Sequence, residues 1–348
     1  MILVFRPRCT KEEVAHAEQH LKELGFEPHT LFGVERTVIA AIGDDRVTTK
    51  EHLETIPGVE RVLPILAPYK LASKEIRPET SVFQLGGPGP QARPTQTRVA
   101  IGGKKIPVIA GPCSVEGRQE VLEVAQAVKE CGASALRAGA FKPRTSPYQF
   151  QGLAEEGLEY LAEARAATGL PIVTEVLTPA DVPLVAKYAD CLQIGTRNMQ
   201  NFMLLRACGE VQTPVLLKRG MSATLEEYLL AAEYILTSGN KSVILCERGI
   251  RTFEQYVRNT FALAVIPALK EKTHLPVLAD PSHGTGVRSL VPPMSKAAVA
   301  CGADGILVEV HPNPEKAKTD GQQTLSVAEF GKLMQELKPV AEAVGRTL

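Results

Sequence analysis

Eight short apolar runs, each followed by a segment of helical periodicity, occupy the chain from about residue 107 to residue 310. Strands that alternate with helices in this way are typical of a parallel sheet, and eight such repeats are the number that closes the sheet into a (β/α)8 barrel, or TIM barrel. In these barrels the side chains at the carboxyl ends of the strands converge on one mouth, where catalysis takes place. The repeat therefore predicts an enzyme of the α/β class.

The first 68 residues precede this repeat and have a different pattern. Short apolar strands and two helical segments follow one another there in the order βαββαβ, which is typical of a small α+β, ferredoxin-like domain. A unit of this kind usually binds a small effector or contacts another subunit. Its strands are predicted at 2–5, 28–32, 37–42 and 59–65, and its helices at 11–24 and 50–56.

Residues 69–97 connect the two parts of the chain. They are rich in glycine and proline, most densely at 86–90, which predicts a linker without regular structure. The barrel domain is then expected to occupy residues 98–348.

Two short strands are predicted at the start of the barrel domain, at 99–101 and 104–106. The glycines at 102 and 103 between them favour a hairpin, which we expect to cover the bottom of the barrel. The barrel helices are predicted at 118–131, 155–168, 180–188, 201–208, 225–237, 253–270, 293–301 and 327–344.

Composition argues against several classes of function. The 39 basic and 39 acidic residues balance, so no general affinity for nucleic acid or for a membrane surface is expected. The amino terminus does not resemble a signal peptide, and no stretch approaches a membrane span of roughly 20 apolar residues. Seven cysteines without a CxxC pair suit a reducing cytoplasm. Five of them are predicted to be small core residues: Cys131, Cys191, Cys208, Cys246 and Cys301.

Six cations follow predicted strands, at their ends or in the loops just beyond. So many cations around one mouth would repel one another unless an anionic ligand neutralised them. We therefore expect a site that holds two phosphates and a carboxylate, with ordinary surface charge as the alternative. The six are Arg137, Lys142, Arg144, Arg197, Lys218 and Arg248.

A thiol, an imidazole and two carboxylates also follow predicted strands. Together they form a complete ligand set for a divalent transition metal ion, and the thiol disfavours magnesium and calcium. Each has a plain alternative, since His283 in DPSHGTG would also cap a turn and Asp320 precedes a glycine as in an ordinary turn. Spacing along the chain leaves both interpretations open. The four residues are Cys113, His283, Glu309 and Asp320.

The segment from Phe141 to Pro147 is the most distinctive in the chain. Lys142 and Arg144 lie on either side of a proline that fixes the backbone, and two hydroxyls, Thr145 and Ser146, follow. Paired cations and hydroxyl donors in this order suit a phosphate group.

Taken together, these motifs resemble the 3-deoxy-D-arabino-heptulosonate 7-phosphate (DAHP) synthase family, in the form with an amino-terminal ferredoxin-like domain (type I, beta subgroup). The resemblance extends over essentially the whole chain. Two positions depart from it: Thr196 stands where the family often has Ala, and Ala138 where Gly is common. The motifs are GPCSVE at 111–116, LRAGAFKPRTSPYQFQG at 136–152, QIGTRNMQN at 193–201, LLKRG at 216–220, LCERG at 245–249, DPSHGTG at 280–286 and GILVEVHPNPEKAKTDGQQ at 305–323.

The resemblance implies a metal-dependent, aldol-type condensation of phosphoenolpyruvate with erythrose 4-phosphate, the first step of the shikimate pathway. It implies one divalent transition metal ion per subunit, with manganese, iron, cobalt and zinc all acceptable, held by Cys113, His283, Glu309 and Asp320. Phosphoenolpyruvate would contact Arg137, Lys142, Glu175, Arg197, Lys218 and Arg248, and erythrose 4-phosphate would lie along Lys142, Arg144, Thr145 and Ser146. Lys142, Cys113 and His283 would be the catalytic residues, with Lys142 or a water molecule as the proton donor to the new hydroxyl.

Three other functions are weighed against this one. The related 3-deoxy-D-manno-octulosonate 8-phosphate synthase takes arabinose 5-phosphate, but it resembles Lys-Ala-Asn-Arg-Ser where this chain has KPRTS at 142–146, and the amino-terminal domain also argues against it. A metal-dependent sugar-phosphate aldolase would not need so many cations. A non-catalytic sensor of aromatic amino acids, with residues 1–68 as its working part, would not need an intact set of metal ligands.

The small domain itself is expected to be regulatory. By resemblance, residues 1–68 would bind tyrosine or phenylalanine between subunits and close the barrel mouth, with a purely structural subunit contact as the alternative. The resemblance also implies a homotetramer located in the cytoplasm.

Overall fold

The computed structural model describes residues 1–32, 36–43, 47–64, 67–86 and 97–348. The chain divides into two compact units, Met1–Glu79 and Thr80–Leu348, with the boundary inside the segment predicted as a linker. No helix among the described residues is long and apolar enough to cross a membrane.

The first unit is a four-stranded antiparallel sheet packed against two helices. The sheet order is β2-β3-β1-β4, as the ferredoxin-like pattern predicted, so the first strand lies between the third and the fourth. Helix α1 begins with a capping box in which Thr10 and Glu13 exchange hydrogen bonds, and it buries Val14, Ala17 and Leu21. The elements are β1 (Ile2–Phe5), α1 (Lys11–Glu23), β2 (Glu27–Phe32), β3 (Thr37–Ile42), α2 (Lys50–Glu54) and β4 (Val59–Leu63). The last strand was predicted to extend from 59 to 65. Strand β4 ends at Leu63, and position 65 lies outside the described residues.

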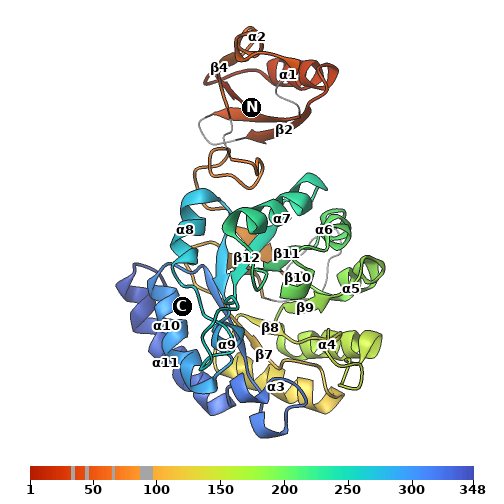
Figure 1. Cartoon of the computed structure of the whole chain (residues 1–348), viewed down its shortest axis with the longest axis vertical. Helices are drawn as coiled ribbons and strands as arrows, with labels where there is room; N and C mark the ends of the chain where they lie inside the picture. The colour runs from red at the N-terminus through yellow and green to blue at the C-terminus, as the bar shows by residue number, and fades with distance from the viewer. Residues whose placement is uncertain (33–35, 44–46, 65–66, 87–96) are drawn as a thin grey trace. The chain divides into compact units, whose positions relative to one another are not determined.

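The second unit is a closed barrel of eight parallel strands, as predicted (Figure 1). Closure comes from the pairing of the last strand, β14, with the first, β7. All eight strands are buried along their length, which explains why they read as continuous apolar runs. They are β7 (Val108–Gly111), β8 (Ala135–Arg137), β9 (Ile172–Val176), β10 (Cys191–Ile194), β11 (Val215–Lys218), β12 (Val243–Glu247), β13 (Val277–Ala279) and β14 (Gly305–Glu309).

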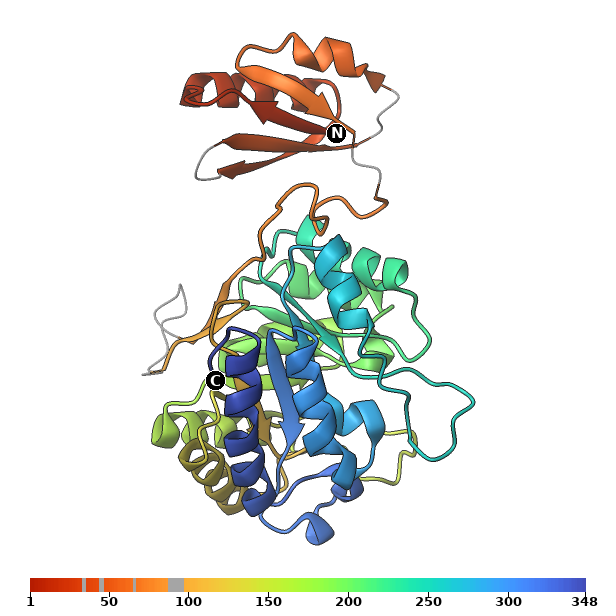
Figure 2. The same ribbon diagram turned by 90° about the vertical axis from the view of Figure 1, so that its left-hand side faces the viewer.

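Helices surround this ring of strands (Figures 1 and 2). Helix α4 ends at Gly169, whose φ of 75° is left-handed and therefore favours glycine. The helices are α3 (Arg118–Glu130), α4 (Ala154–Thr168), α5 (Val182–Tyr188), α6 (Phe202–Gly209), α7 (Leu225–Thr237), α8 (Val265–Lys272), α9 (Pro281–Thr285), α10 (Val291–Ala300) and α11 (Val327–Ala343).

Two predicted elements are wrong. Strand β6 (Val99–Ile101) does not pair with residues 104–106 but with β5 (Phe83–Leu85), a strand inside the segment predicted to be irregular. The helix predicted at 253–270 forms only from Val265 onwards, as α8, and the preceding residues leave the barrel as a long loop (Figure 2). The cysteines differ in part as well, since Cys131 and Cys301 are only half-buried.

The β5–β6 pair nevertheless covers the barrel bottom, as expected of the predicted hairpin. Leu85, Val99 and Ile101 are buried in one cluster with residues of all eight barrel strands, from Ile109 of β7 to Leu307 of β14. The sheet therefore seals the end of the barrel that lies opposite the mouth.

Truncating this seal is expected to destabilise the barrel without touching the mouth. Ile101 is fully buried, so Ile101→Ala should lower the free energy of unfolding by about 2–5 kcal/mol, and Ile101→Val by about 0.5–1.5 kcal/mol. Urea unfolding of the two variants would measure the difference, with unchanged turnover at 25 °C as the control. Equal stability of all three proteins would show that the β5–β6 pair does not contribute to the core.

Candidate active site at the barrel mouth

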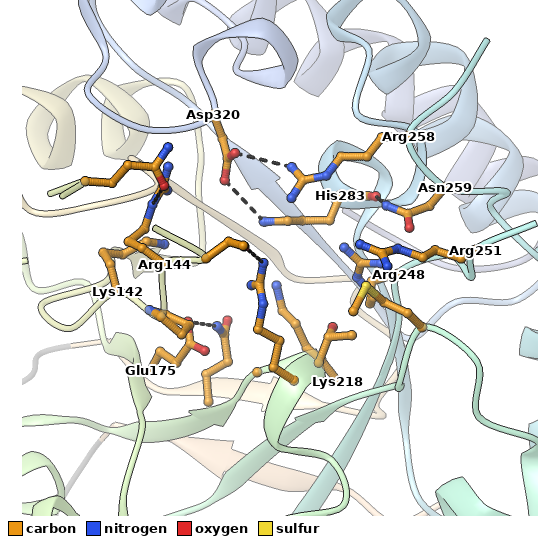
Figure 3. Close-up of a pocket in the computed structure, with 18 of the residues that line it drawn as sticks. Lys142, Arg144, Glu175, Lys218, Arg248, Arg251, Arg258, Asn259, His283 and Asp320 are labelled. Atoms are coloured by element: carbon orange, nitrogen blue, oxygen red, sulfur yellow. Dashed lines mark hydrogen bonds and ion pairs between the residues drawn. The ribbon is translucent and has the colours of Figure 1, made fainter. Parts of the chain in front are cut away.

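A cavity of about 510 Å³ lies at the carboxyl ends of the barrel strands (Figure 3). Its lining is strongly basic, with Glu175 and Asp320 as its acidic members. All six cations predicted from the sequence line it, and the loop after β12 adds Arg251 and Arg258. The mouth thus gathers eight cations around one space, which fits a ligand with several negative charges.

Three of these cations are buried and paired. Arg137 donates from Nη1 to Glu309 Oε1 at 2.8 Å, and both side chains are almost fully enclosed. Lys142 Nζ lies 3.1 Å from Cys113 Sγ and donates to the Cys113 carbonyl oxygen at 3.1 Å. The third, Lys218, donates from Nζ to Asp280 Oδ2 at 2.6 Å. Each of these three cations therefore already has an acceptor inside the protein.

Arg248 differs from these three. It is 4% exposed, and within the described residues its guanidinium forms no ion pair, donates to the Gly249 carbonyl and leaves Nε without a partner. Burial lowers the pKa of Arg248, and the nearby charges of Asp280 and Glu247 offset this effect only in part. A buried guanidinium of this kind is a ready anion site, because a bound phosphate would supply the missing acceptors.

Glu175 is buried near the floor of the cavity on β9. Its Oε2 accepts a weak hydrogen bond from Gln193 Nε2 at 3.4 Å. Gly195 passes so close that a Cβ atom there would lie 2.0 Å from Glu175 Oε1. Glycine at 195 therefore allows this carboxylate to stand among the cations.

The four predicted metal ligands converge at one side of the cavity. The ligand atoms of Cys113, Glu309 and Asp320 lie within 4.8 Å of one another. His283 Nε2 lies 3.5 Å from Glu309 Oε1 and 4.0 Å from Asp320 Oδ2. His283 and Asp320 line the cavity, whereas Cys113 and Glu309 are buried. Cys113 and Asp320 are 207 positions apart in the sequence, so it is the fold of the barrel that brings them together.

The electrostatics of this cluster fit a bound cation. Burial, followed by the charge of Glu309, raises the pKa of the Cys113 thiol to about 12. Burial is the largest influence on Asp320 and Glu309 and opposes their ionisation. His283 and the neighbouring cations together outweigh it, with Arg137 acting on Glu309 and Arg258 on Asp320, and they hold the pKa of both carboxyls below the usual range. Two carboxylates, one imidazole and a thiol in a buried pocket form a donor set that suits a divalent transition metal ion.

Several residues that orient this set were missed by the sequence analysis. Gln323 Nε2 donates to Glu309 Oε2 at 2.7 Å, and Arg258 Nη1 donates to Asp320 Oδ1 at 3.3 Å. Asn259 Nδ2 donates to the carbonyl of His283 at 2.9 Å, and Asp280 contacts the His283 ring at 2.8 Å. Asp280 directly follows β13 beside His283 and so carried a signal, whereas Arg258 and Asn259 lay in the segment mistaken for a helix.

The segment predicted to bind a second phosphate reaches the cavity in part. Arg144 and Thr145 line it, and Thr145 Oγ1 accepts from Arg197 Nη2 at 3.5 Å. Ser146 does not line it, because its hydroxyl turns back to accept from the backbone N–H of Tyr148 at 3.4 Å. The role of Ser146 in binding the second phosphate stays a prediction.

Metal affinity is expected to depend steeply on pH. Because the pKa of Cys113 is raised to about 12, the thiol is protonated at neutral pH and must lose its proton to bind a metal ion. Between about pH 7.5 and 9, where histidine is ordinarily neutral, the association constant for Co²⁺ should rise about tenfold per pH unit. Chelator-competition titrations would measure this slope. Cys113→Ser should bind far more weakly and without that slope, and a flat profile in the unmodified protein would exclude thiolate ligation.

Comparison with known proteins places the whole chain among similar sequences. The model of the DAHP synthetase I family matches residues 89–344, and the model of the DAHP synthase ferredoxin-like domain matches residues 1–67. A phospho-2-dehydro-3-deoxyheptonate aldolase of Thermotoga maritima is 50% identical over 345 residues, which cover 99% of each chain. A 2-dehydro-3-deoxyphosphooctonate aldolase of Bradyrhizobium diazoefficiens is 32% identical over 252 residues, which cover 67% of this chain and 88% of that protein.

Comparison with solved structures points to the same family as the sequence matches. The crystal structure of the Thermotoga maritima DAHP synthase superposes with a TM-score of 0.77 at 49% identity and covers 99% of this chain and 98% of its own. A truncated form of the DAHP synthase from the same organism gives a TM-score of 0.72, also at 49% identity, and covers 80% of this chain and 98% of its own.

Proposed function

This chain belongs to the DAHP synthetase I family, and from that premise we propose that its barrel mouth condenses phosphoenolpyruvate with erythrose 4-phosphate to give DAHP and phosphate. The observation that carries this proposal is the adjacency of two sites in one cavity. The four converging metal-ligand candidates, which include His283, lie beside buried cations. Among those cations Arg248 forms no ion pair with any residue that the structure describes, and its Nε has no hydrogen-bond partner. A reaction that joins an anionic three-carbon unit to an aldehyde needs both sites together.

Phosphoenolpyruvate is assigned to the buried part of the cavity. Arg248, with its unfilled donors, would take the phosphate, and Arg137, Lys142, Arg197 and Lys218 would surround the rest of the molecule. Held in this way, the substrate has its carboxylate and phosphate charges neutralised and its C3 atom directed at the neighbouring aldehyde. Glu175, at the floor, would lie near the substrate's C2 atom as that atom becomes electron-poor, and would stabilise the developing positive charge.

Erythrose 4-phosphate is assigned to the outer part, where Arg144 and Thr145 line the cavity. A guanidinium and a hydroxyl can share its phosphate, which would place the aldehyde end toward Lys142. Ser146 would join them only if the 146–148 turn rearranged on binding, because its hydroxyl now accepts from Tyr148.

The bonds that change follow from the two substrates. C3 of phosphoenolpyruvate bonds to the aldehyde carbon of erythrose 4-phosphate, water adds at C2, and phosphate leaves by cleavage of the C2–O bond. The metal ion that Cys113, His283, Glu309 and Asp320 would hold supplies Lewis acidity toward the aldehyde oxygen. One thiol, one imidazole and two carboxylates would accept manganese, iron, cobalt or zinc.

Lys142 is the residue proposed to protonate the new hydroxyl. Burial lowers its pKa, but Cys113 and Glu175 beside it outweigh that effect and raise the pKa above the ordinary value. The ammonium is therefore protonated when the substrates arrive. Its Nζ lies 3.1 Å from Cys113 Sγ, so it would be next to an aldehyde bound at the proposed metal site.

The experiment that tests the function offers two aldehydes in parallel. Phosphate release from phosphoenolpyruvate by metal-loaded protein is expected with erythrose 4-phosphate and not with arabinose 5-phosphate, and a chelator should abolish it. Preference for arabinose 5-phosphate would instead favour the octulosonate reaction of the more distant relatives. No release with either sugar would overturn the enzymatic proposal.

For the first unit, we propose a regulatory role in which tyrosine or phenylalanine binds and slows the barrel, within a homotetramer in the cytoplasm. The ferredoxin-like match to residues 1–67 and the separate core of this unit support an independent ligand-binding module. Inhibition by each amino acid would be measured on the full chain and after deletion of residues 1–68. Unchanged inhibition in the shortened protein would contradict this role.

A further inference from the structure

Asp280 has no part in the function proposed above, yet it contacts both halves of the site. It directly follows β13, caps α9 and is 1% exposed. Its Oδ2 lies 2.6 Å from Lys218 Nζ and 2.8 Å from His283 Nδ1, and its Oδ1 accepts from the His283 backbone N–H at 3.0 Å. One carboxylate oxygen is thus shared by a candidate metal ligand and a candidate substrate-binding cation.

The contact with the imidazole fixes which ring nitrogen is free. Because a carboxylate accepts hydrogen bonds, the ring proton of neutral His283 is held on Nδ1. The Nε2 lone pair then faces Glu309 Oε1 at 3.5 Å and Asp320 Oδ2 at 4.0 Å. Asp280 therefore presents His283 in the tautomer that a metal ion requires.

The contact with the lysine competes for the same oxygen. A metal ion at Nε2 would draw electron density from the imidazole and make the Nδ1–H group a stronger donor to Asp280 Oδ2. The hold of that oxygen on Lys218 would weaken, and the ammonium charge would become available to an anion in the cavity. The reverse also holds. An anion that draws the Lys218 ammonium away from Asp280 would leave Oδ2 to accept only from His283, which would strengthen metal binding at that ring.

We propose that Asp280 is a positioning residue that couples metal binding at His283 to anion binding at Lys218. The inference rests on the proposed function, since it takes phosphoenolpyruvate as the anion. Linkage requires the coupling to be reciprocal: the factor by which Co²⁺ tightens phosphoenolpyruvate is the factor by which phosphoenolpyruvate tightens Co²⁺. Typical couplings of this kind are about 5- to 150-fold.

Calorimetric titration of the full chain with Co²⁺ and with phosphoenolpyruvate, each alone and in the presence of the other, tests the coupling. In Asp280→Asn, the affinity for Co²⁺ alone should fall by about 10- to 100-fold. The coupling factor should fall about fivefold or more as well, leaving the direct attraction between the metal ion and the anion. The cobalt–thiolate absorption should persist, because Cys113 remains in place.

Asp304 offers a matched control. It is equally buried, accepts from Lys270 at 2.6 Å and from Arg346 at 3.0 Å, and precedes β14 at the opposite end of the barrel. Asp304→Asn should cost stability but leave Co²⁺ affinity and the coupling factor unchanged. A coupling factor that falls equally in both variants, or in neither, would overturn the proposal.

A second pair of variants covers the case in which Asp280→Asn fails to fold. In Lys218→Met, Asp280 Oδ2 contacts only His283, so the affinity for Co²⁺ in the absence of phosphoenolpyruvate should rise. It should rise more than in Arg248→Met, which also removes one positive charge but leaves the contacts of Asp280 unchanged. Equal effects of the two would count against a shared oxygen. Phosphate release by the unmodified protein is measured in parallel: its absence would refute the proposed function, whereas turnover with an unaltered coupling in the variants would refute this inference alone.

Discussion

Lys142→Met is expected to lower kcat by about 1,000-fold, because it removes both a proton donor and a charge beside the reacting atoms. The ammonium is enclosed and lies 3.1 Å from Cys113 Sγ. Methionine fills a similar volume, so the fold should persist, and circular dichroism would verify this. Co²⁺ affinity should not weaken, since a positive charge has left the vicinity of the metal ligands. Turnover and Co²⁺ titration together measure the effect, and a variant that loses its metal ion would show that Lys142 acts through Cys113 instead.

Lys142→Arg separates the two roles of this side chain. Arginine keeps the positive charge but does not give up a proton at any working pH. We expect the affinity for phosphoenolpyruvate to stay within about tenfold while kcat remains about 100-fold or more below that of the unmodified protein. Turnover near the normal rate would mean that the proton of the new hydroxyl comes from water.

Arg248→Met is expected to lower kcat/KM for phosphoenolpyruvate by about 1,000-fold and yet not to destabilise the protein. The first effect follows from the loss of a bidentate donor to phosphate. The second follows because the described residues provide this buried guanidinium with no ion pair, so its removal relieves a desolvation cost. Steady-state kinetics and urea unfolding of the metal-free protein measure the two quantities.

Arg137→Met provides the contrast. It leaves the Glu309 carboxylate, which is 1% exposed, without its cation at 2.8 Å. The free energy of unfolding of the metal-free protein should therefore fall by about 3–5 kcal/mol. If Arg248→Met destabilised the protein as much as Arg137→Met does, Arg248 would have to be a structural residue and not an anion-binding one.

Strand ends were the part of the site that the sequence could predict. In a parallel barrel the last residue of a strand stands at the mouth, so Arg137, Lys218 and Glu309, which end β8, β11 and β14, were placed by strand prediction alone. The same reasoning could not supply the contacts between them. The Lys218–Asp280 pair joins residues 62 positions apart, and no local pattern indicates which two of the strand-end charges will meet.

The loop after β12 shows why a correct periodicity can mislead. Phe253 and Tyr256 are spaced as on one helix face, but they are 97% and 75% exposed. A helix there would therefore not be stabilised by packing of its apolar face. The backbone instead makes a bridge between Ile250 and Thr260 and brings Arg258 and Asn259 to the site. The predicted hairpin at 99–106 failed for a similar reason, because tertiary packing outweighed the local turn signal. Strand β6 pairs with β5, and in that pairing both strands bury apolar side chains against the bottom of the barrel.

The closing pair of the barrel also determines when the proposed metal site would be complete. Cys113 follows β7, Glu309 ends β14, and those two strands become neighbours only when the ring shuts. During synthesis no partial chain that ends before residue 320 holds more than three of the four donors, and in an unfolded chain their separation leaves no preformed site. Metal ions available in the cell would thus be selected by the finished barrel and not by the emerging polypeptide. The binding energy of such an ion would then act mainly as stabilisation of the folded state.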